Sequence, residues 1–130
     1  MFQMDDRFFT GIEFIDEEHR TLIDTTNKAY QIMSNEFIHD KFDYIVEIIE
    51  DLKDYAKEHF RHEEEYMESI SYKKLFTQKI EHAQFIEKIE SFSLEDIDEN
   101  QEEAILELLN FLNDWLVTHI IEKDRLIGQP

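Results

Sequence analysis

A histidine and a carboxylate stand four residues apart in the segment His59-Phe60-Arg61-His62-Glu63. On a helix, residues i and i+4 lie on one face, about 6 Å apart at Cβ, so an imidazole nitrogen and a carboxylate oxygen can converge on one ion. Imidazole suits zinc, iron, copper and nickel, and a carboxylate adds a hard anionic donor. A solvated helix face explains one such pair equally well, because the segment is crowded with charge. The metal interpretation therefore depends on matching donors elsewhere in the chain.

Three further histidines, His19, His82 and His119, lie on the apolar stripes of three other predicted helices. A lone histidine on an apolar face is usually a satisfied core residue, but four of them, one per helix, are hard to explain in that way. In an up-down-up-down bundle, the start of an odd helix and the end of an even helix meet at the same end. His19, His59 and His119 are therefore expected at one level, whereas His82 is expected deeper in the bundle.

Two carboxylates accompany these histidines. Glu63 lies one turn beyond His59, on the predicted buried side, and Asp124 lies five residues beyond His119. Five residues do not return to the same face of a regular helix, so Asp124 can join the group only if the fourth helix ends or distorts after His119. Buried carboxylates are costly unless they are paired or bind a metal. Four imidazoles and two carboxylates fit a metal site better than a structural network.

The elements that must position these residues are long helices. The chain has 130 residues, 42% of them apolar, and only two glycines and one proline, so few residues would break a helix. Apolar spacings of three and four predict helices over about residues 16–35, 40–67, 72–91 and 101–121. Asp16 and Ser71 are the predicted N-caps of the first and third helices, and residues 93–100 are predicted to form a loop. The predicted fold is an all-α, up-down-up-down four-helix bundle in one domain, 1–130, with an irregular arm over about 1–15 and a tail over about 125–130.

Composition excludes several kinds of site and partner. The chain has no cysteine, which removes disulfides, thiolate metal sites and a cysteine nucleophile. A formal net charge of −19 repels nucleic acid and anionic lipid, so neither is an expected partner. The acidic N-terminus lacks the apolar core of a signal peptide, and no apolar run approaches the length of a membrane span. We therefore expect a cytoplasmic protein; no exposed apolar seam indicates its oligomeric state.

The same residues resemble the pattern of the hemerythrin family, from about Gly11-Ile12 to Asp124. The matching motifs are Ile15-Asp16-Glu17-Glu18-His19, His59-Phe60 with Glu63-Glu64 and Met67, His82-Ala83-Gln84-Phe85, and Trp115-Leu116 with His119-Ile120 and Asp124. The resemblance implies two non-haem Fe ions that bind O2, with a dry pocket walled by Phe60, Trp115, Leu116 and Ile120. It places one iron on His19 and His59 and the other on His82 and His119. Glu63 and Asp124 would bridge the irons together with a solvent-derived oxo or hydroxo group.

The sequence departs from the family pattern at Gln78. The family usually has histidines at i and i+4 on the third helix, and here His82 is the second of that pair while Gln78 stands at the first. Gln78 could coordinate through its amide oxygen, a water could take the place, or the second metal could bind poorly. His62 and His39 are not expected to substitute for the missing histidine, because neither is expected to face inward.

An O2-binding di-iron protein (carrier, store, scavenger or sensor) is the function that these residues favour. There are two alternatives. One is a di-iron redox enzyme acting on peroxide or nitric oxide, which an extra exchangeable position at Gln78 would favour. The other is a metal-depleted protein of the same fold. A metal-free interaction module would leave the buried histidines unexplained. A ferritin-like site needs ExxH motifs that the chain lacks at suitable positions. No separate acid–base or nucleophile set points to a hydrolase.

Overall fold

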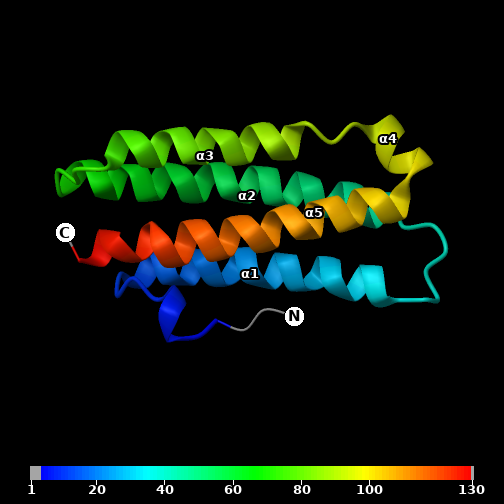
Figure 1. Cartoon of the computed structure of the whole chain (residues 1–130), viewed down its shortest axis with the longest axis horizontal. Helices are drawn as coiled ribbons and strands as arrows, with labels where there is room; N and C mark the ends of the chain where they lie inside the picture. The colour runs from blue at the N-terminus through cyan, green and yellow to red at the C-terminus, as the bar shows by residue number, and fades with distance from the viewer. Residues whose placement is uncertain (1–3, 130) are drawn as a thin grey trace.

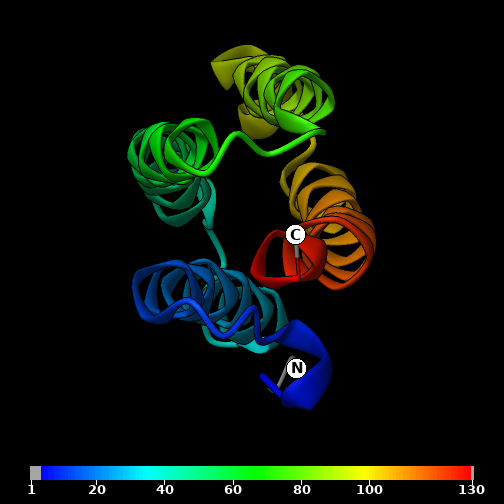
Figure 2. The same cartoon turned by 90° about the vertical axis from the view of Figure 1, so that its left-hand side faces the viewer.

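The computed structural model of the protein describes residues 4–129, and every regular element in that range is a helix. The elements are η1 (Asp6–Phe8), α1 (Glu13–Ser34), α2 (Phe42–Ser69), α3 (Leu75–Glu90), α4 (Leu94–Glu99), α5 (Gln101–Trp115), η2 (Leu116–Ile121) and η3 (Asp124–Gly128). Four long helices, α1, α2, α3 and α5, run side by side in alternating directions (Figure 1). The end-on view in Figure 2 shows them around one central axis. The predicted four-helix bundle is confirmed.

The core of the bundle comes from the apolar stripes that predicted the helices. Buried residues recur at spacings of three and four along each helix, which places them on the face turned towards the other helices. In α2 the buried stripe runs through Ile45, Ile49, Leu52, Ala56, His59, Glu63 and Met67. The apolar residues of this stripe fill the middle of the bundle, and His59 and Glu63 continue it towards the end where α2 meets α3.

The start of α1 differs from the prediction. The helix begins at Glu13, with Ile12 as N-cap, and not at Asp16. Asp16 accepts hydrogen bonds from the backbone N–H of Thr10 at 2.8 Å, from its Oγ1 at 2.9 Å, and from the N–H of Gly11 at 3.2 Å. Its carboxylate therefore holds the incoming loop, where glycine permits the positive φ of 85° at Gly11.

Two boundaries around α3 were also predicted wrongly. Ser71 does not cap α3: it lies in the preceding turn with φ 53°, and the helix begins at Leu75. Residues 93–100 are not only a loop, because they contain α4, whose N-cap Ser93 accepts a hydrogen bond from Asp96 N–H at 3.1 Å. Local side-chain caps and turns decide these boundaries, and the apolar periodicity does not record them.

The last helical stretch, Gln101–Gly128, is long and apolar enough to cross a membrane by length and composition alone. Its buried residues include Ile105, Leu108 and Leu112, which belong to the core of the bundle. A core helix passes the same test of length and composition, so this stretch gives only weak support for a membrane span.

Candidate metal centre

The six residues that the sequence analysis selected lie together at one end of the bundle. His19 comes from α1, His59 and Glu63 from α2, His82 from α3, His119 from η2 and Asp124 from η3. Each is buried, with at most 3% of its surface exposed. His82 lies at the same level as His19 because α3 starts at Leu75. His82 is therefore seven residues into its helix, and His19 is six residues into α1. The prediction that His82 lies deeper in the bundle than the other histidines was therefore wrong.

Glu63 lies between three of the histidines. Its Oε2 is 3.3 Å from His19 Nε2 and 3.2 Å from His59 Nε2. Its Oε1 is 3.0 Å from His82 Nε2. One oxygen of this carboxylate thus faces histidines of α1 and α2, and the other faces the histidine of α3.

Asp124 lies between His19 and the fourth imidazole, His119. Its Oδ2 is 3.0 Å from His19 Nε2, and its Oδ1 is 2.9 Å from His119 Nε2. Two groups of donors result, His19–His59–Glu63–Asp124 and Glu63–His82–His119–Asp124, and within each group the donor atoms lie within 4.8 Å of one another. Both carboxylates are shared by the two groups, as a bridging role requires.

The helical distortion after His119, which the sequence analysis required for Asp124 to join the cluster, is present. The chain changes from the α-helical α5 to a π-helical segment, η2, that contains His119. A π-helix closes its turn with i→i+5 hydrogen bonds, so a residue five positions on returns towards the same face. Asp124 then begins a 3₁₀ turn and is fully buried beside His119.

Unpaired polar atoms in the cluster are a second observation that fits a metal pair. His19 Nε2, His82 Nε2, His119 Nε2 and both oxygens of Glu63 are buried and make no hydrogen bond with any residue in the range 4–129. Burying polar atoms without partners costs free energy, so nearly all such atoms in proteins are satisfied. Metal ions between the imidazoles and the carboxylates would satisfy all of these atoms at once.

Carboxylates from neighbouring helices orient two of the imidazoles. Glu18 Oε1 lies 3.1 Å from His59 Nδ1, and Glu64 Oε2 lies 2.8 Å from His82 Nδ1. A metal-binding histidine commonly donates its other N–H to a carboxylate, which sets the tautomer and the ring orientation. The sequence analysis missed both roles, because Glu18 and Glu64 each serve a histidine on the next helix and periodicity reports only on one helix at a time. His62 lies outside the cluster and contacts the other oxygen of Glu18, at 2.8 Å.

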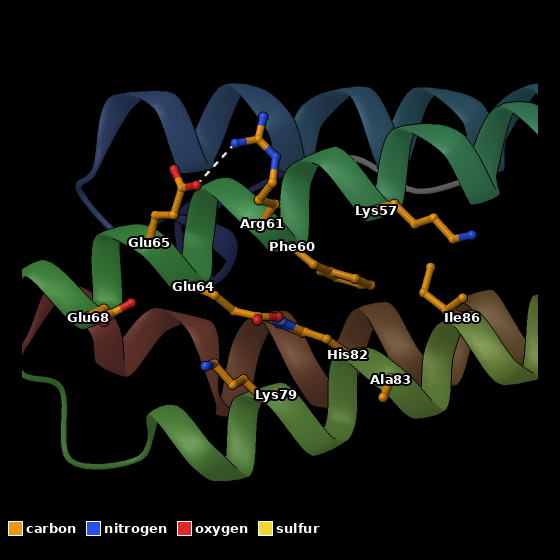
Figure 3. Close-up of a pocket in the computed structure, with 10 residues that line it drawn as sticks. All are labelled: Lys57, Phe60, Arg61, Glu64, Glu65, Glu68, Lys79, His82, Ala83 and Ile86. Carbon is orange, nitrogen blue, oxygen red and sulfur yellow. Dashed lines mark hydrogen bonds and ion pairs between the residues drawn. The ribbon is translucent and has the colours of Figure 1, made fainter.

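An open groove between α2 and α3 borders the cluster at His82 (Figure 3). The groove has a volume of about 450 Å³, and Figure 3 shows the Glu64 carboxylate reaching across it to the His82 ring. Phe60 stacks on His82 with ring centroids 4.0 Å apart, and Trp115 stacks on His119 at 4.1 Å. Leu116 and Ile120 are buried in the core of the bundle.

The buried carboxylates change the proton affinity of the histidines. Burial alone would lower the pKa of His19, but Asp124 and Glu63 outweigh burial and raise this pKa to about 10. Burial likewise opposes Glu63 and Glu64 at His82, and the two carboxylates raise its pKa to about 9. Burial would raise the pKa of Glu63, but the surrounding imidazoles hold it well below its usual value. Without metal the site therefore holds protons at neutral pH, and metal must displace them.

Gln78, the departure from the expected pattern, lies at the edge of this cluster. The side chain is buried, and its Nε2 donates a hydrogen bond to Asp124 Oδ1 at 3.0 Å. Its Oε1 is buried and accepts no hydrogen bond from the described residues. The amide therefore contacts a carboxylate of the cluster directly.

Comparison with known proteins agrees with the fold. The family model described as the Hemerythrin HHE cation binding domain matches residues 10–129. The chain belongs to the hemerythrin family. The bacteriohemerythrin of Clostridium acetobutylicum is 51% identical over 125 residues, which cover 96% of this chain and 97% of the relative.

More distant relatives align over most of the same length. The bacteriohemerythrin of Methylococcus capsulatus is 28% identical over 125 residues, covering 93% of this chain and 88% of the relative. The myohemerythrin of Theromyzon tessulatum is 30% identical over 120 residues, covering 92% and 84%. These relatives and the family model support a hemerythrin-type, metal-binding helical bundle.

Proposed function

We propose that this protein binds two non-haem iron ions and uses the pair to bind O2. The observation that carries the proposal is the sharing of Glu63 and Asp124 between two sets of imidazoles, each set buried and within reach of both carboxylates. Imidazole and carboxylate donors suit iron, and the family to which the chain belongs is one of non-haem iron proteins. His19 and His59 would hold one ion, His82 and His119 the other, and Glu63 and Asp124 would bridge them.

The protein supplies the ligands and a dry pocket, and the bound irons would supply the O2 chemistry. Phe60 and Trp115 stack on two of the ligand imidazoles, so they hold the ring planes. Glu18 and Glu64 orient His59 and His82 from behind. Each of these side chains acts on a ligand and not on O2. We propose a cytoplasmic location as well, from the sequence alone.

The test is iron per chain, with absorbance recorded first without oxygen and then in air. About two irons per chain, together with a visible charge-transfer band that disappears when O2 is removed, would support O2 binding. Irreversible oxidation of two irons would instead favour the redox enzyme acting on peroxide or nitric oxide. One iron or none after reconstitution with ferrous iron would contradict the di-iron proposal.

A further inference from the structure

Gln78 reaches the cluster through a single oxygen atom. Asp124 Oδ1 is 3.0 Å from the Gln78 amide nitrogen and 2.9 Å from His119 Nε2. An amide NH2 is a hydrogen-bond donor and offers no lone pair to a metal. The contact therefore anchors the carboxylate and does not add a donor to the metal site.

The two donor groups are consequently equal. Each contains two imidazoles and one oxygen from each of the two carboxylates. Gln78 contacts the cluster through its amide nitrogen, which is not a metal donor. A histidine in place of Gln78 would break this equality by adding a third imidazole to the group of His82 and His119.

A small cleft lies beside the amide. It is lined by Tyr72, Thr77, Gln78, Lys123 and Leu126, among others, and offers about 10 Å³ to a water-sized molecule. This is close to the smallest volume that takes one water molecule. One water molecule there would supply a donor for Gln78 Oε1, which is buried and has no hydrogen-bond donor among the described residues.

We infer that Gln78 is a positioning residue: it anchors Asp124 and leaves the His82–His119 metal with the same number of protein donors as the His19–His59 metal, so that both metals take an exogenous ligand. This inference rests on the proposed di-iron function. It favours two exchangeable positions in place of the one that a third imidazole would leave.

The experiment counts azide, a small anion that binds ferric iron, on the wild-type protein and two variants. Wild type, Gln78→His and Gln78→Leu are loaded with iron, oxidised and titrated with azide, and iron per chain is measured in the same samples. We expect two azide ions per iron pair in wild type, because the donor sets are equal. Gln78→His should bind one azide fewer, and Gln78→Leu should bind as many as wild type, with weaker retention of iron because Asp124 has lost its anchor.

The outcomes separate this inference from the proposed function. Two irons with a single azide in wild type overturn the inference while the di-iron function stands. An additional azide on Gln78→Leu relative to wild type also overturns it, since Gln78 would then be a ligand. Fewer than two irons in wild type defeat the proposed function, and the inference falls with it. Iron retention in Gln78→Leu equal to that of wild type removes the anchoring role. The wild-type azide count still tests the second exchangeable position if a variant fails to fold.

Discussion

Glu63 and Asp124 are the residues on which the site depends, because each presents its two oxygens to different imidazoles. His19 Nε2 faces both of them, at 3.3 and 3.0 Å. Without metal, these imidazoles and carboxylates hold protons between them at neutral pH, and a metal pair would take the place of those protons. The polar atoms at this end of the bundle are arranged for cations.

His59→Ala tests the ligand assignment. The variant should lose iron and lose the thermal stabilisation that iron gives, because a ligand that binds only the folded state stabilises it by about 2.7 kcal/mol at 100 times its Kd. Iron per chain and Tm with and without iron are the measurements. His39→Ala is the matched control, since His39 is an exposed histidine outside the cluster. Unchanged iron content in His59→Ala would remove His59 from the site.

The pH dependence of the iron-free protein follows from the raised histidine pKa values. The folded-state pKa of His19 is about 10 and that of His82 about 9, against an ordinary value of 6.5. A raised folded-state pKa stabilises the protein fully below pH 6.5, and this stabilisation is lost as the pH rises through the folded-state pKa. The Tm of iron-free protein should therefore fall by roughly 5 °C or more between pH 6.5 and pH 9.

The iron-loaded protein is the comparison for this titration. Iron binds deprotonated imidazoles, so the gain in Tm on loading should grow over the same pH range. A Tm of iron-free protein that stays level or rises towards pH 9 would contradict the assigned pKa shifts.

At the scale of elements, the end of the last helix decides whether the site is complete. The π-helical η2 and the 3₁₀ turn η3 bring His119 and Asp124 onto one face. The turn η3 packs against the loop before α1, where a Cβ added at Gly128 would overlap the carbonyl oxygen of Thr10. This close backbone contact fixes the position of the segment that carries Asp124.

Gly128→Ala should therefore push η3 away from the loop and weaken iron binding. Overpacking of this kind costs about 1–3 kcal/mol, measured as the free energy of unfolding of the iron-free protein in urea. Gly11→Ala is the control: its φ of 85° costs an alanine about 1–2 kcal/mol, but an added Cβ meets no atom within 4 Å. Iron affinity should fall in Gly128→Ala and not in Gly11→Ala; equal affinities would show that η3 tolerates the displacement.

For the whole molecule, charge is the dominant property. A net charge of −19 on 130 residues destabilises the compact state through self-repulsion. Exposed ion pairs such as Arg61 with Glu58 and Glu65 offset little of it, because surface pairs contribute up to about 1 kcal/mol each.

Salt should consequently stabilise the iron-free protein. Raising NaCl from about 0.01 M to about 0.5 M shortens the Debye length from about 30 Å to under about 8 Å, which screens the repulsion. We expect Tm to rise, with sucrose at equal osmolality as the uncharged control. A lower Tm in salt would mean that attractive ion pairs outweigh the net repulsion.

Much of the fold and of the candidate site followed from the sequence alone. Apolar spacing is a property of one helix, so it identified four amphipathic helices and placed His19, His59, Glu63, His82 and His119 on their inward faces. Few chain breakers and short connections were enough for an alternating bundle. The motifs around the histidines were specific enough to indicate the family.

The tertiary structure alone decided how Asp124 and Gln78 take part. Asp124 reaches the same face as His119 only through a π-helical distortion. The Gln78 amide donates to the Asp124 carboxylate, which lies 46 positions further along the chain. Glu18 and Glu64 serve histidines on neighbouring helices for the same reason. Periodicity states which way a side chain faces, but the atom it meets depends on how separate helices pack, and no single segment of sequence contains that information.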